Sequence, residues 1–404
     1  MKICYITATS PFGSSESFIT EEMLEVKRQG INLLIIPRNP RQDIFHKSAN
    51  ELVEYAIWLP LIDLKMIFCF FRALIFDLSL IKIAFKIIKS SRKPWILIKN
   101  IVILPKAIFI SKIIPKQNVE HIHAHWGSTT ATIAYVVSRL TKIPWSCTFH
   151  RGDIKENNML REKVKSAHFI RCISKHGKNE LINLIGEENK KKIMVIYEGI
   201  KIPNTSREVS KHDSIFRIVT PANLYKVKGH EYLIEACSML LKRDITNIRF
   251  VFYGEGTLRD ELKELIKKKS LATYIHMPGI IAHENLIEMY GNREIDSVVL
   301  PSITTKRGEH EGIPVSLMEA MANKIPTIST DTGGISELLS DGAGIVVEEK
   351  NSEKLANAIE ILLKNQRLRH EIGMRGYRRV VERFNISTTV EKLLENICAH
   401  TFDS

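Results

Sequence analysis

The sequence contains few cysteines, and they are not grouped. Its 404 residues include six, with no C-x-x-C step among them: Cys4, Cys69, Cys147, Cys172, Cys237 and Cys398. Single cysteines in mostly apolar runs exclude a disulfide scaffold and indicate reduced, buried thiols. The first residues, MKICYITATSPFG, also lack the long apolar region of a signal peptide. We therefore expect a cytoplasmic protein.

Long uncharged apolar runs are also absent. No stretch approaches the roughly 18 to 20 residues that a membrane-spanning helix requires. A composition of 44% hydrophobic and 25% charged residues, without a low-complexity tract, excludes a disordered chain. At 404 residues the chain is too long for one ordinary core, so we expect two domains of about 200 residues each.

The net charge of +13 is unevenly distributed. Residues 61–116 hold eleven Lys or Arg but only two acids, Asp63 and Asp77. Four lysines recur at helical steps, as expected for one face: Lys82, Lys86, Lys89 and Lys93. Apolar residues cluster on another face: Ile81, Phe85 and Ile88. The pattern indicates an interfacial helix on an anionic membrane surface, a helical hairpin packed on its own domain, or both. It does not favour nucleic acid, because aliphatic side chains outnumber aromatic ones and no nucleic-acid motif is present.

Short apolar runs alternate with longer amphipathic stretches along the chain. The runs predict strands at 2–8, 31–38, 120–126, 144–150, 169–174, 192–197, 216–222, 248–253, 273–277, 297–301, 326–330 and 344–348. The amphipathic stretches predict helices at 15–29, 128–141, 230–243, 258–269, 314–323 and 335–340, then at 353–366 and 386–399. This rhythm predicts two doubly wound α/β domains, with the polar stretch 201–214 as a hinge and the last helices capping or bridging the two.

The stretch 309–337 is the most informative part of the chain, because a loop, a helix start, a buried strand and a glycine turn follow one another. Gly312 relaxes the backbone, and Pro314 suits the first position of a helix. The next free N–H groups, those of Val315 and Ser316, can then point outward and attract phosphate. We expect a polyanion site at this helix start.

Two glutamates frame that site. Glu311 precedes the helix, and Glu319 falls in its second turn. Carboxylates beside bound phosphate usually hold hydroxyl groups, so a nucleotide sugar is the expected ligand. Read alone, two glutamates eight positions apart favour ordinary roles, Glu311 as a solvated loop acid and Glu319 as a helix-surface residue. The apolar neighbours of Glu319 predict instead that it is buried or half buried and has a partner.

Other polar residues follow predicted strands, where ligands of doubly wound sheets bind. Gly13 is placed to approach phosphate or sugar, although its neighbouring serines are also ordinary helix caps. Lys228 can neutralise a diphosphate without a metal, or is a surface lysine. Gly254 begins a glycine turn that lacks the third glycine of a dinucleotide fingerprint. His150 faces the ligand or has a structural role.

Three histidines alternate in the predicted strand 120–126: His121, His123 and His125. Their spacing places all three on one sheet face, where zinc is conceivable. We do not expect a metal, because no matching carboxylate or cysteine ligand is evident.

Together these motifs resemble glycosyltransferase family 4, the retaining GT-B enzymes that use nucleotide-sugar donors. EGIPVSLMEAMANKIPTISTDTGGISELL, residues 311–339, resembles the family signature, with its E-x7-E pair on Glu311 and Glu319 and its glycine loop on Gly333 and Gly334. YKVKGHEYLIEA resembles the family's K-G element, and FHRGDI places His150 at the family's active-site histidine. SPFGSSESFITEEM and the signature look most like colanic-acid and other exopolysaccharide transferases.

The resemblance implies a GT-B fold, two Rossmann-like domains facing across a cleft with C-terminal helices bridging them. Residues 1–203 would be the acceptor-side domain with the basic insertion, 209–380 the donor domain, and 381–404 a helix packing back on the first domain. The implied enzyme moves a sugar from a UDP- or GDP-sugar to a glycan, with retention and without a metal or other cofactor. The acceptor would be lipid-linked, at the inner face of a bacterial cell membrane, in surface polysaccharide synthesis.

The resemblance also assigns roles to residues. Glu319 would hold the ribose, Glu311 the donor sugar, and Lys228 the diphosphate, while His150 contacts the transferred sugar. The remaining donor-site residues would be Gly13, Gly254, Gly312, Ile313, Val315, Ser316, Gly333 and Gly334.

Two positions depart from the family pattern. Asn223 stands where the family usually has an arginine, and Lys226, Lys306 or Arg307 would have to supply that charge. Glu198 stands where the family usually has an asparagine before Gly199. Asn223 keeps open a non-catalytic GT-B-like subunit, with a weakened donor site, that binds a membrane or another transferase. A nucleotide-sugar epimerase on the same fold is a further alternative, whereas a phosphorylase would need a pyridoxal phosphate lysine that we do not find.

Overall fold

The computed structural model describes residues 1–13, 16–40, 43–44, 47–203 and 215–399. The chain forms two compact units: a first unit of Met1–Gly199 with Ile386–Ser404, and a second unit of Ile200–Asn385. Most of the predicted hinge, residues 204–214, lies outside the described residues. The chain passes from one unit to the other at Gly199–Ile200 and again at Asn385–Ile386.

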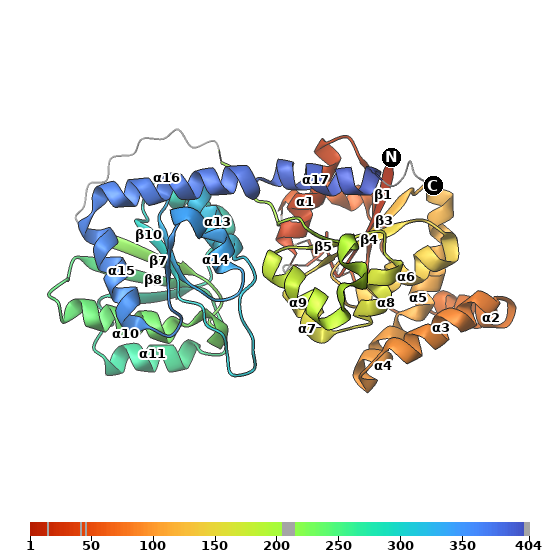
Figure 1. Ribbon diagram of the computed structural model, residues 1–404, viewed down its shortest axis with the longest axis horizontal. Coiled ribbons are helices and arrows are strands. Elements are labelled where there is room, and N and C mark those ends of the chain that lie inside the picture. The colour runs from red at the N-terminus through yellow and green to blue at the C-terminus, as the bar shows by residue number, and fades with distance from the viewer. Residues whose placement is uncertain (14–15, 41–42, 45–46, 204–214, 400–404) are drawn as a thin grey trace. The chain divides into compact units, whose positions relative to one another are not determined.

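The first unit is built on a parallel sheet of order β2-β1-β3-β4-β5-β6, of which Figure 1 labels β1, β3, β4 and β5. Its strands are β1 (Lys2–Thr7), β2 (Asn32–Pro37), β3 (His121–His125), β4 (Trp145–Phe149), β5 (Ile170–Cys172) and β6 (Ile193–Val195). Strand order reverses beside β1, so the carboxyl ends of β1 and β3 form the switch point at which such sheets bind ligands.

Helices cover both faces of this sheet. They are α1 (Ser17–Arg28), α2 (Leu64–Phe76), α3 (Leu78–Ser90), α4 (Pro94–Val102), α5 (Leu104–Ile113), α6 (Thr129–Thr141), α7 (Arg151–Glu156), α8 (Leu160–Ser166), α9 (Lys175–Ile185) and α17 (Ile386–Cys398). Alternate residues of β1 point to opposite sides: Ile3 and Tyr5 pack with α1 and α17, whereas Cys4 and Ile6 share a core with α5 and α6. Burial on both faces explains why the strands read as continuous apolar runs.

The second unit repeats this plan with a parallel sheet of order β12-β11-β10-β7-β8-β9. Its strands are β7 (Phe216–Pro221), β8 (Ile248–Tyr253), β9 (Ile275–Gly279), β10 (Ser297–Leu300), β11 (Thr327–Thr330) and β12 (Ile345–Val347). Its helices are α10 (His230–Leu241), α11 (Arg259–Lys268), α12 (His283–Gly291), α13 (Val315–Ala322), α14 (Ile335–Leu338), α15 (Ser352–Lys364) and α16 (Gln366–Arg383). Here the switch point lies between β7 and β10. The prediction of two doubly wound α/β domains is confirmed, with all twelve strands found.

Helix α16 is the main element that the sequence pattern missed. Two of its four buried residues are glycines, Gly373 and Gly376, so its packed face does not read as apolar. A Cβ at Gly373 would lie 2.2 Å from the carbonyl oxygen of Lys324, which explains why a small residue is needed there. Helix α17 follows it in sequence, belongs to the first unit and packs against α1.

The basic stretch forms four helices, α2 to α5, instead of one interfacial helix or one hairpin. Helix α3 ends at Ser90, and Lys93 is the N-cap of α4, so the expected face of four lysines is interrupted. The buried face of α3 is formed by Leu80, Ile83 and Ile87, and the predicted apolar cluster of Ile81, Phe85 and Ile88 is exposed. No helix in the described part of the chain is both long and apolar enough to cross a membrane.

Candidate functional site

In the second unit, the start of α13 lies after the loop that leaves β10, at the carboxyl edge of the sheet. Pro314 has extended backbone angles and is the N-cap, so the helix begins one residue later than predicted, at Val315. The first amide that bonds back within this turn is that of Leu317, to the carbonyl oxygen of Pro314. The amides of Val315 and Ser316 therefore precede the helical hydrogen bonds, as a phosphate-binding helix end requires.

Lys228 and Glu311 meet beside this helix start. Lys228 ends a single 3₁₀ turn (Lys226–Lys228) between β7 and α10. Its Nζ lies 2.6 Å from Oε1 of Glu311, and the two side chains are only 20% and 13% exposed. Ser302, at the end of β10, donates a longer hydrogen bond of 3.5 Å to the same carboxylate oxygen. Two residues that lie 83 positions apart, and that were predicted separately, thus form one charged pair.

The glycines around this pair allow backbone segments to approach closely. A Cβ at Gly333, where φ is +59°, would lie 1.9 Å from the carbonyl oxygen of Glu311. A Cβ at Gly334 would lie 2.8 Å from Cγ1 of Ile313, and the Gly334 amide donates to the carbonyl of Gly312 at 3.2 Å. The predicted glycine loop therefore packs directly on the segment that holds Glu311, and larger residues would displace it.

The turn after β8 has a similar packing explanation. A Cβ at Gly254 would lie 2.2 Å from the carbonyl oxygen of Ala222, and one at Gly256 would lie 2.5 Å from that of Leu224. These glycines bring the turn against the loop between β7 and α10. The close approach is sufficient to account for both glycines.

Glu319 lies in the second turn of α13, half buried, and has a partner, as the apolar sequence around it predicted. Its Oε1 lies 2.7 Å from Nε2 of His283, at the start of α12. Glu311 thus lies in the loop before α13, and Glu319 lies in its second turn. The sequence pattern did not identify His283, because 36 residues separate it from Glu319.

The position that departs from the family pattern, Asn223, is exposed. Of the three suggested substitutes for its missing charge, Lys226 directs its Nζ to Oε1 of Glu231 at 2.6 Å, on the side of α10. Lys306 and Arg307 are exposed in the loop after β10. Lys228 is therefore the cation that the structure places directly against Glu311.

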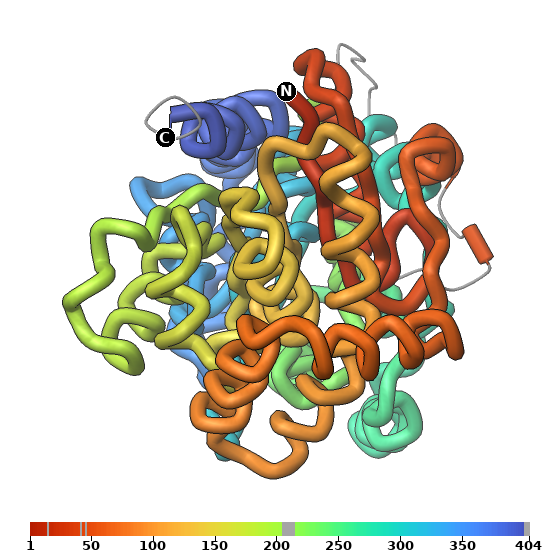
Figure 2. The backbone as a smooth tube through the Cα atoms, turned by 90° about the vertical axis from the view of Figure 1, so that its right-hand side faces the viewer, coloured from red at the N-terminus to blue at the C-terminus, as the bar shows by residue number. Residues whose placement is uncertain are grey.

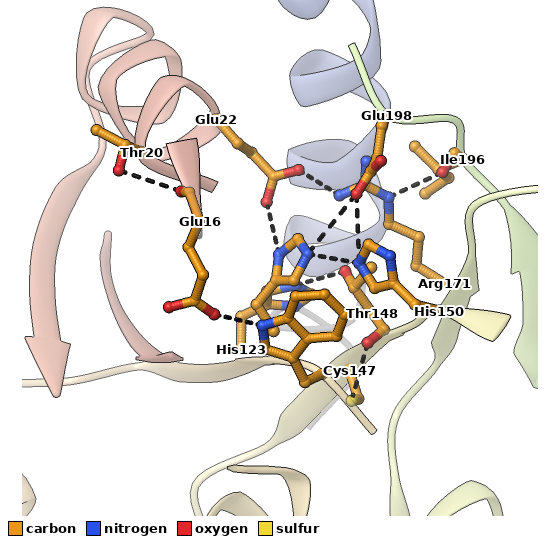
Figure 3. Close-up of polar contacts among 12 residues, drawn as sticks. Glu16, Thr20, Glu22, His123, Cys147, Thr148, His150, Arg171, Ile196 and Glu198 are labelled. Atoms are coloured by element: carbon orange, nitrogen blue, oxygen red, sulfur yellow. Dashed lines mark hydrogen bonds and ion pairs between the residues drawn. The ribbon is translucent and has the colours of Figure 1, made fainter. Parts of the chain in front are cut away.

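In the first unit, His150 lies at the carboxyl end of β4 and is the N-cap of α7, where its amide donates to Oδ2 of Asp153 at 2.9 Å. Its Nε2 lies 2.9 Å from Nε2 of His125 and 3.3 Å from Oε1 of Glu198. Figure 3 shows His150, Glu198, Glu22 and Arg171 converging from separate segments. Glu198, at the position where the family has an asparagine, is thus a direct neighbour of the predicted active-site histidine.

An ion pair fixes this group of side chains. The guanidinium of Arg171 donates to Glu22, and also to the carbonyls of Ile196 and Tyr197 at 2.8 and 2.7 Å, which holds the segment leading to Glu198. Burial opposes ionisation of Glu22, but Arg171 together with His125 and His123 outweighs it, and the pKa of that carboxyl is lowered. Burial raises the pKa of Glu198 to about 7, with His125 and Arg171 opposing the shift. Burial, followed by His125 and Arg171, holds the pKa of His150 well below its ordinary value.

The loop after β1 is fastened to the same region by Glu16. One oxygen of its carboxylate accepts from the amides of Thr9 and Ser10, both at 2.6 Å, and the other accepts from the indole of Trp126. The ring of Trp126 lies 4.2 Å from that of His150, measured between centroids. Gly13, with φ of +85°, donates its amide to the carbonyl of Asp43 at 2.9 Å. Its left-handed conformation explains the glycine, while Ser14 and Ser15 lie outside the described residues.

The alternating histidines of β3 differ in their partners. Nε2 of His121 and Nδ1 of His123 each lie 2.8 Å from the hydroxyl of Ser146, and Nε2 of His123 lies 3.0 Å from that of Thr148. Neighbouring strand hydroxyls therefore satisfy these two rings. His125 instead faces carboxylates, with Nδ1 3.6 Å from Oε1 of Glu22 and Nε2 3.9 Å from Oε1 of Glu198.

Two sets of these side chains are close enough to hold a cation: Glu22 with His123 and His125, and His125 with His150 and Glu198. The expectation that no carboxylate lies near the histidines is therefore wrong. In the first set, however, His123 is bonded to hydroxyls and Arg171 already neutralises Glu22. A dication there would also face a fixed guanidinium, which disfavours binding.

Comparison with known proteins bears on both units. Residues 202–379 match the family described as glycosyl transferases group 1. WcaL of Salmonella typhimurium, named for colanic acid biosynthesis, is 33% identical over 215 residues, which cover 51% of this chain and 52% of WcaL. The chain thus matches about half the length of this relative.

Solved structures match along nearly the full length. A glycosyltransferase from Rickettsia africae has a TM-score of 0.71 at 21% identity, covering 100% of this chain and 99% of its own. Anabaena HepE, solved in complex with UDP-glucose, has a TM-score of 0.70 at 17% identity, covering 99% and 100%. These similarities confirm the predicted GT-B architecture of two Rossmann-like halves.

Proposed function

Starting from the similarity of residues 202–379 to glycosyl transferases group 1, we propose that the chain is a retaining glycosyltransferase of family 4. It moves a sugar from a UDP- or GDP-sugar to a glycan in the synthesis of a bacterial surface polysaccharide. The observation that carries the proposal is the 2.6 Å contact of Lys228 with Glu311 beside the free amides of α13. One cation, one carboxylate and a helix N-terminus together suit a diphosphate joined to a sugar.

The donor site follows from the chemistry of each group. Glu319, half buried beside His283, accepts hydrogen bonds from the ribose hydroxyls. Glu311 accepts from hydroxyls of the donor sugar, and the amides of Val315 and Ser316 face the diphosphate. Gly312, Ile313, Gly333 and Gly334 form the close-packed backbone that holds these groups in place, and Gly254 shapes the neighbouring turn.

Lys228 has the largest part in the reaction. As the bond from the anomeric carbon to the diphosphate oxygen breaks, negative charge develops on the nucleoside diphosphate. Donor binding separates Lys228 from Glu311, so the ammonium turns to the leaving group while the carboxylate turns to the sugar. The bond to the acceptor hydroxyl forms as the leaving group departs, and the hydroxyl proton is released. We propose that a lysine and helix amides supply the positive charge, so that no metal is needed.

In the first unit, we propose that His150 contacts the transferred sugar and that Gly13, in the loop after β1, contacts phosphate or sugar. Both residues are at carboxyl ends of strands in their sheet, the edge at which parallel α/β sheets bind ligands. We place the enzyme in the cytoplasm at the inner face of the membrane, acting on a lipid-linked acceptor. The similarity to WcaL supports the polysaccharide assignment.

Calorimetric titration tests the donor site. The purified chain is titrated with UDP, GDP, ADP and their common sugar conjugates in metal-free buffer. We expect one base to bind, and Glu319→Ala to weaken that binding about tenfold or more, since a hydrogen bond to a charged group is lost. Glu284→Ala is the matched control, because Glu284 is an exposed acid on α12 beside His283. If no nucleotide binds, the non-catalytic subunit becomes the better reading.

A further inference from the structure

The surface between Trp58 and Val102 is strongly apolar. Among the described residues, 21 large apolar side chains are exposed, and 15 of them lie in this segment. Single exposed apolar residues are ordinary on soluble proteins, but a contiguous patch of them marks an interaction surface. Figures 1 and 2 show α2, α3 and α4 on the outside of the first unit.

These side chains form one stripe on each of three helices. Each stripe follows steps of three and four residues, so its members share a helix face. They are Leu64, Phe68, Phe71 and Ile75 on α2; Leu78, Ile81, Phe85 and Ile88 on α3; and Trp95, Ile98 and Val102 on α4. Phe71 and Phe85 are 59% and 65% exposed. The buried residues of the same helices, such as Met66, Ile83 and Ile96, are on other faces and fill the core.

Basic side chains border the stripes. At about 100° per residue, exposed bases fall along one edge of two of the stripes: Lys65 and Arg72 on α2, and Lys82 and Lys89 on α3. The two acids of the segment are occupied as N-caps, since Asp63 accepts from the amide of Lys65 and Asp77 from that of Ser79. Lys86 and Lys99 do not contribute, because they pair with Glu162 and Glu156, each at 3.0 Å. The surface therefore has an apolar centre and a cationic edge.

We propose that the outer faces of α2, α3 and α4 dock into the boundary between headgroups and acyl chains of an anionic bilayer. Interfacial helices have this combination of a bulky apolar face and lysines beside it. Trp95 adds an amphipathic ring with cations over it, Nζ of Lys99 lying 4.3 Å and that of Lys93 5.9 Å from its centroid. A second copy of the chain is a poorer occupant, because a symmetric contact would bring cationic edges together.

Docking goes beyond sugar transfer and is independent of it, because the surface contains none of the residues assigned to the donor site. It gives the proposed lipid-linked acceptor a physical route to the enzyme. Its test uses the full chain without donor or acceptor, so failure of docking and failure of sugar transfer are separate results.

The first experiment is co-sedimentation with vesicles of mixed phosphatidylglycerol and phosphatidylcholine. Phe71→Gln/Phe85→Gln is expected to lower vesicle partitioning by about tenfold or more, because two apolar side chains leave the bilayer. Leu184→Gln/Ile361→Gln is the matched control, since it removes two exposed apolar side chains elsewhere. Equal partitioning of wild type and the Phe71/Phe85 variant would overturn the proposal.

A second experiment tests the contribution of charge to vesicle binding. It compares Lys82→Gln/Lys89→Gln with Lys267→Gln/Lys268→Gln, which changes two exposed lysines of α11. The first pair should lose about fivefold in partitioning per lysine on anionic vesicles, and the second should lose little. Equal losses from the two pairs would overturn the proposed orientation.

The depth to which this surface enters the bilayer is measured with brominated lipids, which quench the fluorescence of indole rings that enter the bilayer. Trp58 and Trp95 are 49% and 44% exposed on this surface, whereas Trp145 is buried. Quenching should occur and should disappear in Trp58→Phe/Trp95→Phe. If wild type does not bind vesicles but forms dimers by ultracentrifugation that Phe71→Gln/Phe85→Gln abolishes, the occupant is a second copy and the bilayer proposal is wrong.

Discussion

Nζ of Lys228 lies 2.6 Å from Oε1 of Glu311, although the two residues come from different loops of the second unit. Each charge compensates the other while no diphosphate is present. In the function proposed above, a bound nucleotide sugar exchanges this one contact for two, lysine to phosphate and carboxylate to sugar. The pair would then link donor binding to the positioning of the leaving-group cation.

Lys228→Ala is expected to lower kcat by about 10²- to 10³-fold, because one preorganised charge at the leaving group is lost. Steady-state transfer with the donor identified by calorimetry measures the effect. Lys226→Ala is the matched control: this lysine is two residues earlier and binds Glu231, so its loss should change kcat less than about twofold. Equal losses in the two variants would contradict the role given to Lys228.

Glu198 gives a pH-dependent contribution to stability. Burial raises the pKa of its carboxyl to about 7 from an ordinary value of 4.5, so the folded chain keeps a proton there that the unfolded chain releases. Between these values the folded state binds more protons, and the stability from this group falls as pH rises from about 4.5 to about 7. Glu198→Gln removes that fall.

Thermal unfolding of wild type and Glu198→Gln at pH 5 and pH 8 isolates this contribution, because titrations common to both proteins cancel in the difference. We expect the variant to gain a few degrees in Tm relative to wild type on going from pH 5 to pH 8, on the order of 1 kcal/mol or more. Two Tm curves that stay parallel across this range would show that Glu198 is ionised in the folded chain throughout.

Local patterns predicted all twelve strands, because buried parallel strands read as apolar runs. They also predicted the residues around α13, because neighbouring residues such as Gly312 and Pro314 mark the helix start. They could not show which strand ends meet. Glu22, Arg171 and Glu198 join His125 and His150 only because β1, β3, β4, β5 and β6 are neighbours in the sheet. His283 is likewise brought to Glu319 by the packing of α12, and no nearby residue indicates it.

Periodicity also left the surface of α2 to α4 undecided. Helix α3 has two apolar stripes, one containing Ile83 and Ile87 and one containing Phe85 and Ile88. A helical pattern shows that both exist but not which one is buried. Packing against α6 decides it, and the bulkier stripe stays outside.

Gly333→Ala should destabilise the second unit by about 2 to 4 kcal/mol. The strain of a left-handed alanine accounts for about 1 to 2 kcal/mol, and the clash of its Cβ with the carbonyl of Glu311 adds to that strain. Gly308→Ala is the matched control, since φ is +70° there and no atom lies within 4 Å of the added Cβ. Chemical denaturation measures both variants. Equal losses would mean that the loop of Gly333 relaxes away from Glu311, and the close packing proposed for the donor site would then be wrong.

Removal of metal ions should leave the reaction rate unchanged. The proposed leaving-group site consists of an ammonium group and two amides, and it needs no cation bridged by carboxylates. Within the first unit, His125, His150 and Glu198 could hold a cation, since their ligand atoms lie 2.9 to 3.9 Å apart. Turnover is compared before and after dialysis against EDTA, and again after adding Mg²⁺, Mn²⁺ or Zn²⁺.

The variant His125→Gln is measured in the same way, because it removes one candidate metal ligand. If EDTA abolishes turnover in wild type and a single metal restores it, charge stabilisation by Lys228 is insufficient. If His125→Gln also weakens binding of that metal, the ion belongs to the histidine group and not to the donor diphosphate.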